Sequence, residues 1–288
     1  MILDGKKTSE MIVKQIAEEV AKLPVPLTLA IILVGNNPAS QVYVRNKIKA
    51  CTEAGIGVRD YYLSENATQK EVLQIIEECN KDDSVNGILV QLPLPCHLEQ
   101  DLIINAIDPK KDVDGLTVIN QGRLFNGMEA IIPATPKGVI TLLQKYFIEL
   151  SGKNALVIGR SNLVGKPLAL LLLQKNATVT IAHSRTQNLK ELAKRADILI
   201  AAVGKPYFVT ADMVKKEAVV VDVGINKVEG KIVGDVDFAA VKDIASYITP
   251  VPRGVGPMTI ASLLENVVCC YKMQAKERET REASGLLE

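Results

Sequence analysis

A lysine on the apolar side of a predicted helix is the residue best placed for proton transfer. The spacing of apolar residues predicts a helix that starts near Pro38. At about 100° per residue, Ser40, Tyr43 and Lys47 share an arc of roughly 60° on this helix. Most polar residues lie on the opposite half. The residues that flank Lys47 are Val44, Ile48, Cys51 and Ala54.

Two interpretations of Lys47 stay open at this point. An ammonium group on an apolar face can extend along the helix until it reaches water. Alternatively, Lys47 lines a ligand-binding cleft, where desolvation lowers its pKa and lets the neutral amine accept a proton. In that case it is the best proton-transfer candidate in the chain, because His97 and His183 have no partner that the sequence identifies.

Polar residues beyond a buried strand form a second group of candidates. The segment 87–92 reads as a buried strand that carries Gln91 near its end, where two prolines turn the chain away. Ligands in parallel α/β folds gather beyond such carboxyl ends. Asp112 and Asp114 follow in an irregular stretch. A turn-forming role before Gly115 is open for both carboxylates, and we favour it more for Asp112 than for Asp114.

A glycine turn between a predicted strand and a predicted helix indicates a dinucleotide site. The strand 154–158 runs into Gly159-Arg-Ser161, and a helix follows from Gly165. Unpaired N–H groups and the positive end of the helix suit a pyrophosphate. Five residues separate the two glycines, unlike the G-x-G-x-x-G pattern, so a purely structural turn also remains open.

The end of the next strand favours NADP over NAD. The strand 177–182 ends in His183-Ser-Arg-Thr186, without the acid that usually holds the ribose 2′-hydroxyl of NAD. Ser184, Arg185 and Arg160 can together hold a 2′-phosphate. The alternative is that both arginines are solvated surface charges.

Composition excludes several other functions. The 288 residues hold 34 Lys plus Arg and 33 Asp plus Glu, so no overall basic charge indicates nucleic acid. Five cysteines without a CxxC pair and two isolated histidines do not make a zinc site, and we expect no metal. Apolar runs are too short to span a membrane. The odd cysteine count and the lack of a basic apolar leader favour a cytoplasmic protein.

Strand and helix patterns alternate along the chain, which predicts α/β architecture with parallel sheets. We expect two α/β domains flanking a cleft, the second a Rossmann-like parallel sheet. The first domain comprises residues 1–136 with a returning helix at 258–275, the second comprises residues 137–257, and residues 276–288 form a frayed tail. The predicted strands are 27–34, 58–63, 87–92, 155–158, 177–182, 197–203, 218–223 and 246–248. The predicted helices are 9–22, 39–54, 69–80, 98–107, 167–175, 189–195 and 258–274.

Taken together, these motifs resemble the bifunctional methylenetetrahydrofolate dehydrogenase/methenyltetrahydrofolate cyclohydrolase family. They span nearly the whole chain in the order of that family. The matching pieces are Tyr43-Val-Arg-Asn-Lys47, Val90-Gln-Leu-Pro-Leu-Pro95, Lys111-Asp-Val-Asp-Gly115, Thr135-Pro-Lys-Gly138, Gly159-Arg-Ser161 through Val164-Gly-Lys-Pro167, His183-Ser-Arg-Thr186, Val223-Gly-Ile-Asn226, Gly234-Asp-Val236, Thr249-Pro-Val-Pro252 and Gly254-Val-Gly-Pro-Met-Thr259.

The resemblance implies NADP-dependent oxidation of 5,10-methylenetetrahydrofolate, hydrolysis of the methenyl product to 10-formyltetrahydrofolate, and a homodimer. It thereby implies a role in one-carbon metabolism and purine biosynthesis. It makes Lys47 the catalytic lysine, tuned by Gln91, with Tyr43 packed on the folate and Asp114 anchoring the pterin. The substrate-binding residues expected are Ser40, Tyr43, Gln91, Leu92, Asp114, Pro252 and Gly254. The cofactor-binding residues expected are Gly159, Arg160, Ser161, Ser184, Arg185 and Ile225, with Arg185 added from the phosphate argument.

The chain departs from the family at a few positions. Arg253 stands where the family usually has glycine, and this long cation can narrow the cleft or meet the acidic folate tail. Leu116-Thr-Val118 replaces the more usual Phe-His-Pro, and Ala134 replaces a common cysteine. A dehydrogenase without the hydrolytic step, an NAD-linked relative and a catalytically silent binding protein on the same fold remain alternatives.

Overall fold

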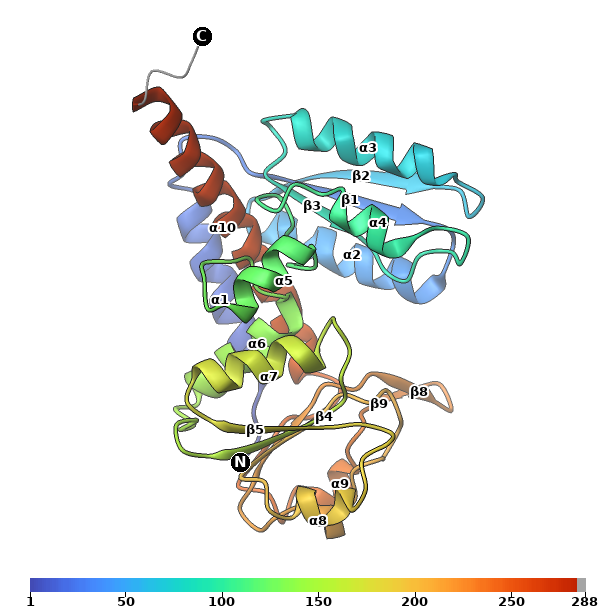
Figure 1. Cartoon of the computed structure of the whole chain (residues 1–288), viewed down its shortest axis with the longest axis vertical. Helices are drawn as coiled ribbons and strands as arrows, with labels where there is room; N and C mark the ends of the chain where they lie inside the picture. The colour runs from blue at the N-terminus through green and yellow to red at the C-terminus, as the bar shows by residue number, and fades with distance from the viewer. Residues whose placement is uncertain (284–288) are drawn as a thin grey trace. The chain divides into compact units, whose positions relative to one another are not determined.

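The computed structural model describes residues 1–283, with side-chain surroundings through residue 280. These residues form two compact units (Figure 1). The five-strand unit comprises Met1–Met11 and Pro133–Ser262. The three-strand unit comprises Ile12–Ile132 and the described residues from Leu263 onward.

The three-strand unit is built on a short parallel sheet with β1 in the middle, in the order β2-β1-β3. Its strands are β1 (Thr28–Val34), β2 (Gly57–Leu63) and β3 (Gly87–Val90). Its helices are α2 (Pro38–Glu53), α3 (Gln69–Lys81), α4 (Gln100–Asn105) and α5 (Val118–Phe125). Strands β1 and β3 are buried apolar runs, and their side chains Ile32 and Ile88 pack with Ile76 of α3 and Ile103 of α4. Burial of this apolar surface stabilises the sheet that carries Gln91 at its edge.

The five-strand unit is a doubly wound parallel sheet in the order β10-β7-β6-β4-β5. Its strands are β4 (Asn154–Ile158), β5 (Thr178–Ala182), β6 (Ile198–Ala201), β7 (Val219–Asp222) and β10 (Tyr247–Ile248). Its helices are α6 (Ala134–Lys145), α7 (Gly165–Gln174), α8 (Leu189–Ala193), the 3-10 turn η1 (Ala211–Met213) and α9 (Phe238–Val241). Helices α6 and α7 cover one face of the sheet, and α8 and α9 cover the other (Figure 1). The expected Rossmann-like parallel sheet is confirmed.

Strand order determines where a ligand can bind in the five-strand unit. Strand β4 pairs with β5 on one side and with β6 on the other, all in parallel. The chain therefore changes direction of winding at β4, and loops that follow β4 and β5 diverge there. Such a switch point, beyond the carboxyl ends of the strands, is the usual ligand site of open α/β sheets.

The unit boundaries differ from the expected domains at the start of the chain. Residues 1–11 group with the five-strand unit because Ile2 forms a parallel bridge with Ile248, and the Leu3 amide donates to the Ile248 carbonyl at 2.8 Å. Helix α1 (Gly5–Val20) starts in this unit and ends in the other. Helix α10 (Val255–Ala283) likewise belongs to both units.

The expected frayed tail is wrong for residues 276–283, which continue α10. Lys110 forms an ion pair with Glu277, which ties this part of the helix to the three-strand unit. The remaining tail residues, 284–288, lie outside the described residues.

Among residues 1–283, none of the helices combines the length and the apolar character that a membrane-spanning segment requires.

The punctuated stretch 108–137 holds two helices that the sequence analysis missed. Thr117 caps α5, because its side chain accepts from the Asn120 amide. Helix α6 starts directly after Pro133 and keeps Pro136 in its first turn, where the missing N–H costs no hydrogen bond. Gly127 follows the end of α5, Pro133 directly precedes α6 and Pro136 lies in its first turn, so these residues mark helix boundaries. A small antiparallel hairpin, β8 (Asn226–Val228) with β9 (Lys231–Val233), was also not expected.

Candidate active site

Helix α2 turns Lys47 away from water. Asn37 caps the helix, since its side chain accepts from the Ala39 and Ser40 amides. Ser40, Val44 and Cys51 are buried on the inner side, and Lys47 is half-buried beside them. The Lys47 ammonium donates to Oε1 of Gln91 at 3.1 Å. This bond and the lowered pKa of the amine favour the desolvated interpretation of Lys47 over the snorkelling one.

Gln91 follows β3 directly and is held in a single orientation. Its amide N–H donates to the Ile32 carbonyl of β1, which extends the strand pairing by one residue. Its side-chain Nε2 donates to the Leu92 carbonyl at 2.6 Å. That bond leaves Oε1 as the atom that meets Lys47. Gln91 thus presents an acceptor to the amine, as a residue that positions the lysine must.

The two aspartates of the Lys111-Asp-Val-Asp-Gly115 motif have different surroundings. The Asp112 carboxylate is buried and accepts from the Leu116 and Thr117 amides and from the Asn120 side chain. The turn-forming interpretation of Asp112 is therefore confirmed. Asp114 has no such backbone partners among the described contacts, and its charge acts on Lys47.

Lys111 explains how this motif is held in place. Its ammonium donates to the carbonyls of Cys79, Asn80 and Asp82 at 2.8–2.9 Å, at the C-terminal end of α3. The Lys111 carbonyl accepts from the Ile88 amide of β3. The motif is thus fastened to α3 and to β3, three residues before Asp114.

Burial dominates the electrostatics around Lys47. It lowers the pKa of the Lys47 amine, and the negative charge of Asp114 opposes this effect. Burial also raises the pKa of Asp114, which the Lys47 charge opposes and Asp112 reinforces. The pKa of the Cys51 thiol rises to about 12 for the same reason, so the thiol is neutral at pH 7. The surroundings therefore favour the neutral form of the Lys47 amine more than bulk water does.

The other residues expected to bind substrate lie in both units. Tyr43 precedes Lys47 by four residues on α2 and is 39% exposed, so its ring is available to a ligand. Ser40 is buried and Leu92 is half-buried in the same unit. Pro252 and Gly254 belong to the five-strand unit. There a Cβ on Gly254 would lie 2.3 Å from the Pro250 carbonyl oxygen, which explains the glycine.

The glycine turn after β4 is closely packed. Gly159 has a φ of +127° and packs so closely that a Cβ would lie 2.2 Å from the Ala202 oxygen. Gly165 leaves no more room, since its Cβ would lie 2.2 Å from the Gly159 oxygen. The Ser161 hydroxyl accepts from the Val164 amide at 3.2 Å. The turn is compact, and it leads into α7 with Arg160 and Ser161 exposed.

The turn after β5 presents two further polar side chains. The His183 amide donates to the Thr186 hydroxyl, and Nδ1 of His183 accepts from the Arg185 amide. This tight turn leaves Ser184 and Arg185 exposed. In the described part of the chain, neither Arg160 nor Arg185 has an acidic partner within 4.0 Å. Arg160 and Arg185 thus lie exposed in the turns that follow the adjacent parallel strands β4 and β5.

Ile225, the remaining residue expected to bind cofactor, is 48% exposed at the carboxyl edge of the same sheet. Sequence reasoning missed the two carboxylates beside it, Asp222 and Asp235, which are both buried. A usable signal was present, because the apolar run 219–221 ends directly in a charged residue. Buried charges at the end of a strand indicate a structural or functional task.

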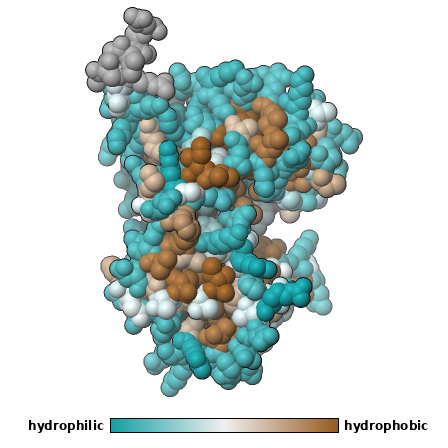
Figure 2. All heavy atoms as spheres, in the orientation of Figure 1, coloured by the Kyte–Doolittle hydropathy of each residue, from teal (hydrophilic) through white to brown (hydrophobic). Residues whose placement is uncertain are grey.

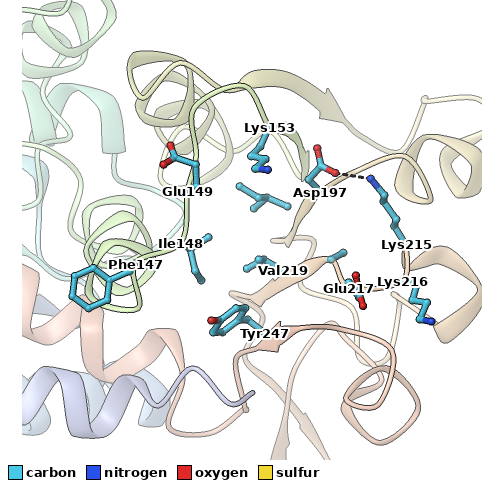
Figure 3. Close-up of a pocket in the computed structure, with 12 residues that line it drawn as sticks. Phe147, Ile148, Glu149, Lys153, Asp197, Lys215, Lys216, Glu217, Val219 and Tyr247 are labelled. Atoms are coloured by element: carbon cyan, nitrogen blue, oxygen red, sulfur yellow. Dashed lines mark hydrogen bonds and ion pairs between the residues drawn. The ribbon is translucent and has the colours of Figure 1, made fainter.

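Neither a metal-binding cluster nor the open cavity of the five-strand unit adds a catalytic group in the described residues. They hold no cluster of three or more His, Cys, Asp or Glu side chains that fits a metal ion. An open cavity of about 380 Å³ lies at the opposite, amino-terminal edge of the five-strand sheet (Figure 3). Lys215 pairs with Asp197 there at 2.6 Å. The cavity has three lysines and three acids, so its charges balance and select no ligand class.

Fold and side chains together define a two-unit α/β protein with a dinucleotide-type turn and a desolvated lysine. Residues 3–114 match the tetrahydrofolate dehydrogenase/cyclohydrolase catalytic domain, and residues 133–275 match the NAD(P)-binding domain of the same family. The chain belongs to the tetrahydrofolate dehydrogenase/cyclohydrolase family. The function class expected from the motifs is thereby confirmed.

Individual relatives agree with this assignment. The bifunctional protein FolD of Campylobacter concisus is 56% identical over 271 residues, which cover 93% of this chain and 96% of that protein. The crystal structure of the bifunctional FolD dehydrogenase/cyclohydrolase of Campylobacter jejuni has a TM-score of 0.94 and 52% identity, covering 95% of this chain and 99% of that one. A Trypanosoma brucei dehydrogenase-cyclohydrolase, solved with NADP and an inhibitor, has a TM-score of 0.91 and 36% identity, covering 96% and 98%.

Proposed function

We propose that this chain oxidises 5,10-methylenetetrahydrofolate to the methenyl derivative with NADP⁺ and then hydrolyses that product to 10-formyltetrahydrofolate. The observation that carries the proposal is the bond from the Lys47 ammonium to Gln91, beside Asp114, in a member of this family. A silent binding protein has no need of a desolvated lysine held by an oriented amide. The two activities together link three oxidation or hydration states of the folate one-carbon unit.

The oxidation step depends on alignment more than on protein chemistry. When bound, NADP⁺ supplies the hydride acceptor, and the protein holds donor and acceptor in reacting geometry. Gly159, Ser161 and Ile225 are the residues that we assign to the cofactor at the switch point. The compact turn and the exposed Ile225 side chain support that assignment.

Selectivity for NADP⁺ is assigned to Arg160, Ser184 and Arg185. All three are exposed at the carboxyl ends of β4 and β5, and no acid occurs in the turn 183–186. An acid at that place would repel a 2′-phosphate, whereas two guanidinium groups and a hydroxyl can bind it. The donor set present therefore fits the 2′-phosphate of NADP better than the 2′-hydroxyl of NAD.

The folate contacts that we propose are those expected from the sequence motifs. Tyr43 offers a partly exposed ring to the flat aromatic part of the substrate, and Asp114 offers a carboxyl group to the pterin. Ser40, Leu92, Pro252 and Gly254 complete the proposed contacts. Gln91 contacts Lys47 and so acts as the residue that positions and tunes the amine.

The hydrolytic step requires the transfer of protons. The neutral Lys47 amine takes a proton as the water oxygen bonds to the methenyl carbon. The ammonium so formed then protonates N5 as the bond between this carbon and N5 breaks. The hydroxyl proton leaves through the amine to solvent, and the formyl group stays on N10. Burial lowers the pKa of Lys47, which makes the neutral amine more available for the first of these steps.

A homodimer and a cytoplasmic location complete the proposal. Strand β5 is an edge of the five-strand sheet, with Ile181 41% exposed, and the neighbouring α7 exposes 59% of Leu173. Apolar side chains gather over this part of the surface in Figure 2. An exposed strand edge beside apolar side chains is a typical place for pairing between chains. In the described residues no disulfide joins the cysteines, which agrees with a reducing compartment.

One spectrophotometric experiment tests the proposed function. Formation of the methenyl product is followed with methylenetetrahydrofolate and either NADP⁺ or NAD⁺, and decay of added methenyltetrahydrofolate is followed separately. We expect both activities and a clear preference for NADP⁺. A preference for NAD⁺ would overturn the assignment of the arginines, and enzyme-independent methenyl decay would remove the hydrolytic step.

A further inference from the structure

Two buried carboxylates at the carboxyl edge of the five-strand sheet have no part in the chemistry described so far. We propose that Asp222 and Asp235 are positioning residues, which hold three backbone segments in the shape that receives the nicotinamide cofactor. The segments are 203–205, 224–226 and 234–236. The inference rests on the proposed function, because it concerns the same cofactor site.

Asp235 holds the loop that follows β6. Its Oδ2 accepts from the Val203 amide at 2.6 Å and from the Gly204 amide at 2.9 Å, and its Oδ1 accepts from the Lys205 amide at 2.9 Å. Three consecutive amides therefore converge on one carboxylate. Oδ1 also accepts from the side-chain amide of Asn226 at 2.9 Å, next to Ile225. One carboxylate thus joins two loops at the same edge.

Asp222 in turn holds the segment that carries Asp235. Its Oδ1 accepts from the Gly224 and Asp235 amides at 2.9 Å, and its Oδ2 accepts from the Val236 amide at 2.8 Å. The Asp222 amide donates to the Thr249 hydroxyl at 2.7 Å, so its own position is fixed as well. Asp222, at the end of β7, therefore fixes Asp235, and Asp235 fixes the loop after β6.

Two glycines leave room for the carboxylates. A Cβ on Gly234 would lie 1.8 Å from Oδ2 of Asp222, and a Cβ on Gly224 would lie 2.2 Å from Oδ1 of Asp235. A side chain at either glycine would therefore overlap with the carboxylate that packs against it. This packing gives a physical reason for the Val223-Gly-Ile-Asn226 and Gly234-Asp-Val236 motifs.

The arrangement reaches the glycine turn through Ala202. This residue directly precedes the amides that Asp235 binds, and its carbonyl oxygen lies where a Cβ on Gly159 would fall. A shift of the loop after β6 would therefore move the oxygen that packs on the turn. On the other side, the hydrogen bond from the Asn226 side chain to Asp235 fixes the residue next to Ile225. Both parts of the proposed cofactor site depend on the same carboxylate.

Without a nearby cation, burial of the two carboxylates lowers the stability of the fold more than a purely structural contact would need to. In the described part of the chain, no Lys, Arg or His nitrogen lies within 4.0 Å of either carboxylate. Backbone amides and one side-chain amide alone satisfy these buried charges. Burying a charge without a counter-ion costs stability, whereas neutral residues can close a loop without that cost. A requirement for a fixed loop shape explains why the charges are kept.

The test compares Asp235→Asn with Asp237→Asn, the same change two residues further on. Asp237 only caps α9, through the Ala240 amide. Hydrogen exchange of the Val203, Gly204 and Lys205 amides is measured in the cofactor-free protein, and the Kd for NADP⁺ is measured by calorimetry. For Asp235→Asn we expect exchange about tenfold faster and NADP⁺ binding about tenfold weaker, as loss of hydrogen bonds to a charged group implies. Asp237→Asn changes neither.

The outcomes separate positioning from mere stabilisation. Unchanged exchange at these amides would overturn the assignment of Asp235, and faster exchange with an unchanged Kd would show a structural role only. If Asp235→Asn does not fold, Asn226→Ser removes a single bond to the carboxylate, and an unaltered NADP⁺ Kd in that variant overturns the inference. Failure of the wild-type protein to bind NADP⁺ would instead contradict the proposed function.

Discussion

The Nζ atom of Lys47 lies 3.1 Å from Oε1 of Gln91, and the other side-chain atom of that amide is held by the Leu92 carbonyl. The glutamine therefore cannot turn its N–H₂ group toward the lysine without losing a hydrogen bond. It stabilises the amine through an uncharged acceptor. An uncharged partner holds the lysine in position without forcing it to stay protonated, which a carboxylate would do.

This contact predicts the effect of Gln91→Glu. A carboxylate beside the amine favours the ammonium and raises the pKa of Lys47. Because hydrolysis begins with the neutral amine, the acidic limb of its pH profile should move to higher pH by about one to two units. The rate at pH 7 should fall by about tenfold. The check is kcat/KM for methenyl hydrolysis across pH; a profile that superimposes on the wild-type profile would rule out tuning by Gln91.

Removal of the buried Lys111 ammonium should cost stability. Lys111→Met leaves the carbonyls of Cys79, Asn80 and Asp82 without their shared donor. We expect a loss of about 2–4 kcal/mol in the free energy of unfolding, seen in thermal or urea denaturation. The control is Lys81→Met at the end of α3, since Lys81 pairs with Glu77 at the surface. Equal stability of the two variants would show that the buried ammonium contributes little.

Cofactor selectivity is tested at Arg185. Arg185→Ser removes one of two guanidinium groups assigned to the 2′-phosphate. The KM for NADP⁺ should rise by about ten- to a hundredfold, because a charge-assisted bond is lost, and the KM for NAD⁺ should stay within about twofold. Initial rates with both nucleotides give the comparison. Parallel changes in the two KM values would mean that Arg185 does not discriminate between them.

Arg253 occupies a backbone conformation that suits glycine better. Its φ is +84°, and its carbonyl oxygen accepts from the Lys6 amide. A left-handed conformation costs a side-chain-bearing residue roughly 1–2 kcal/mol, of which the greater freedom of unfolded glycine offsets about half. Arg253→Gly should therefore raise the free energy of unfolding by up to about 1 kcal/mol. A lower melting temperature would contradict this. A comparison of the KM for a polyglutamylated folate between wild type and Arg253→Gly tests whether the Arg253 guanidinium contacts the acidic folate tail.

Sequence patterns were most informative where a single periodic element carries the chemistry. The angular positions on α2 indicated that Lys47 leans toward the buried side, and Ser40, Val44 and Cys51 are indeed buried there. The preference for a turn-forming Asp112 was also correct, because a carboxylate before a glycine commonly binds nearby amides. Local geometry decides both cases.

Contacts between distant segments could not be predicted in this way. Asp222 and Asp235 come into hydrogen-bond contact only once the sheet has formed. The three carbonyls that bind Lys111 likewise come from the end of an earlier helix. Helices α5 and α6 were missed because their prolines and glycines were interpreted as breaks, although Pro136 stands in a first turn. Residues 1–11 join the five-strand unit through a bridge to Ile248, which no local pattern indicates.

The central claim is that the Lys47 amine transfers the protons of hydrolysis, and Lys47→Met tests it most directly. The control is Lys49→Met, since Lys49 is exposed on the same helix and pairs with Glu53. We predict that Lys47→Met loses enzymatic decay of methenyltetrahydrofolate while its NADP⁺ Kd stays within about twofold of wild type, because the two sets of residues lie in different units. Wild-type hydrolysis by the Lys47→Met protein would contradict the account.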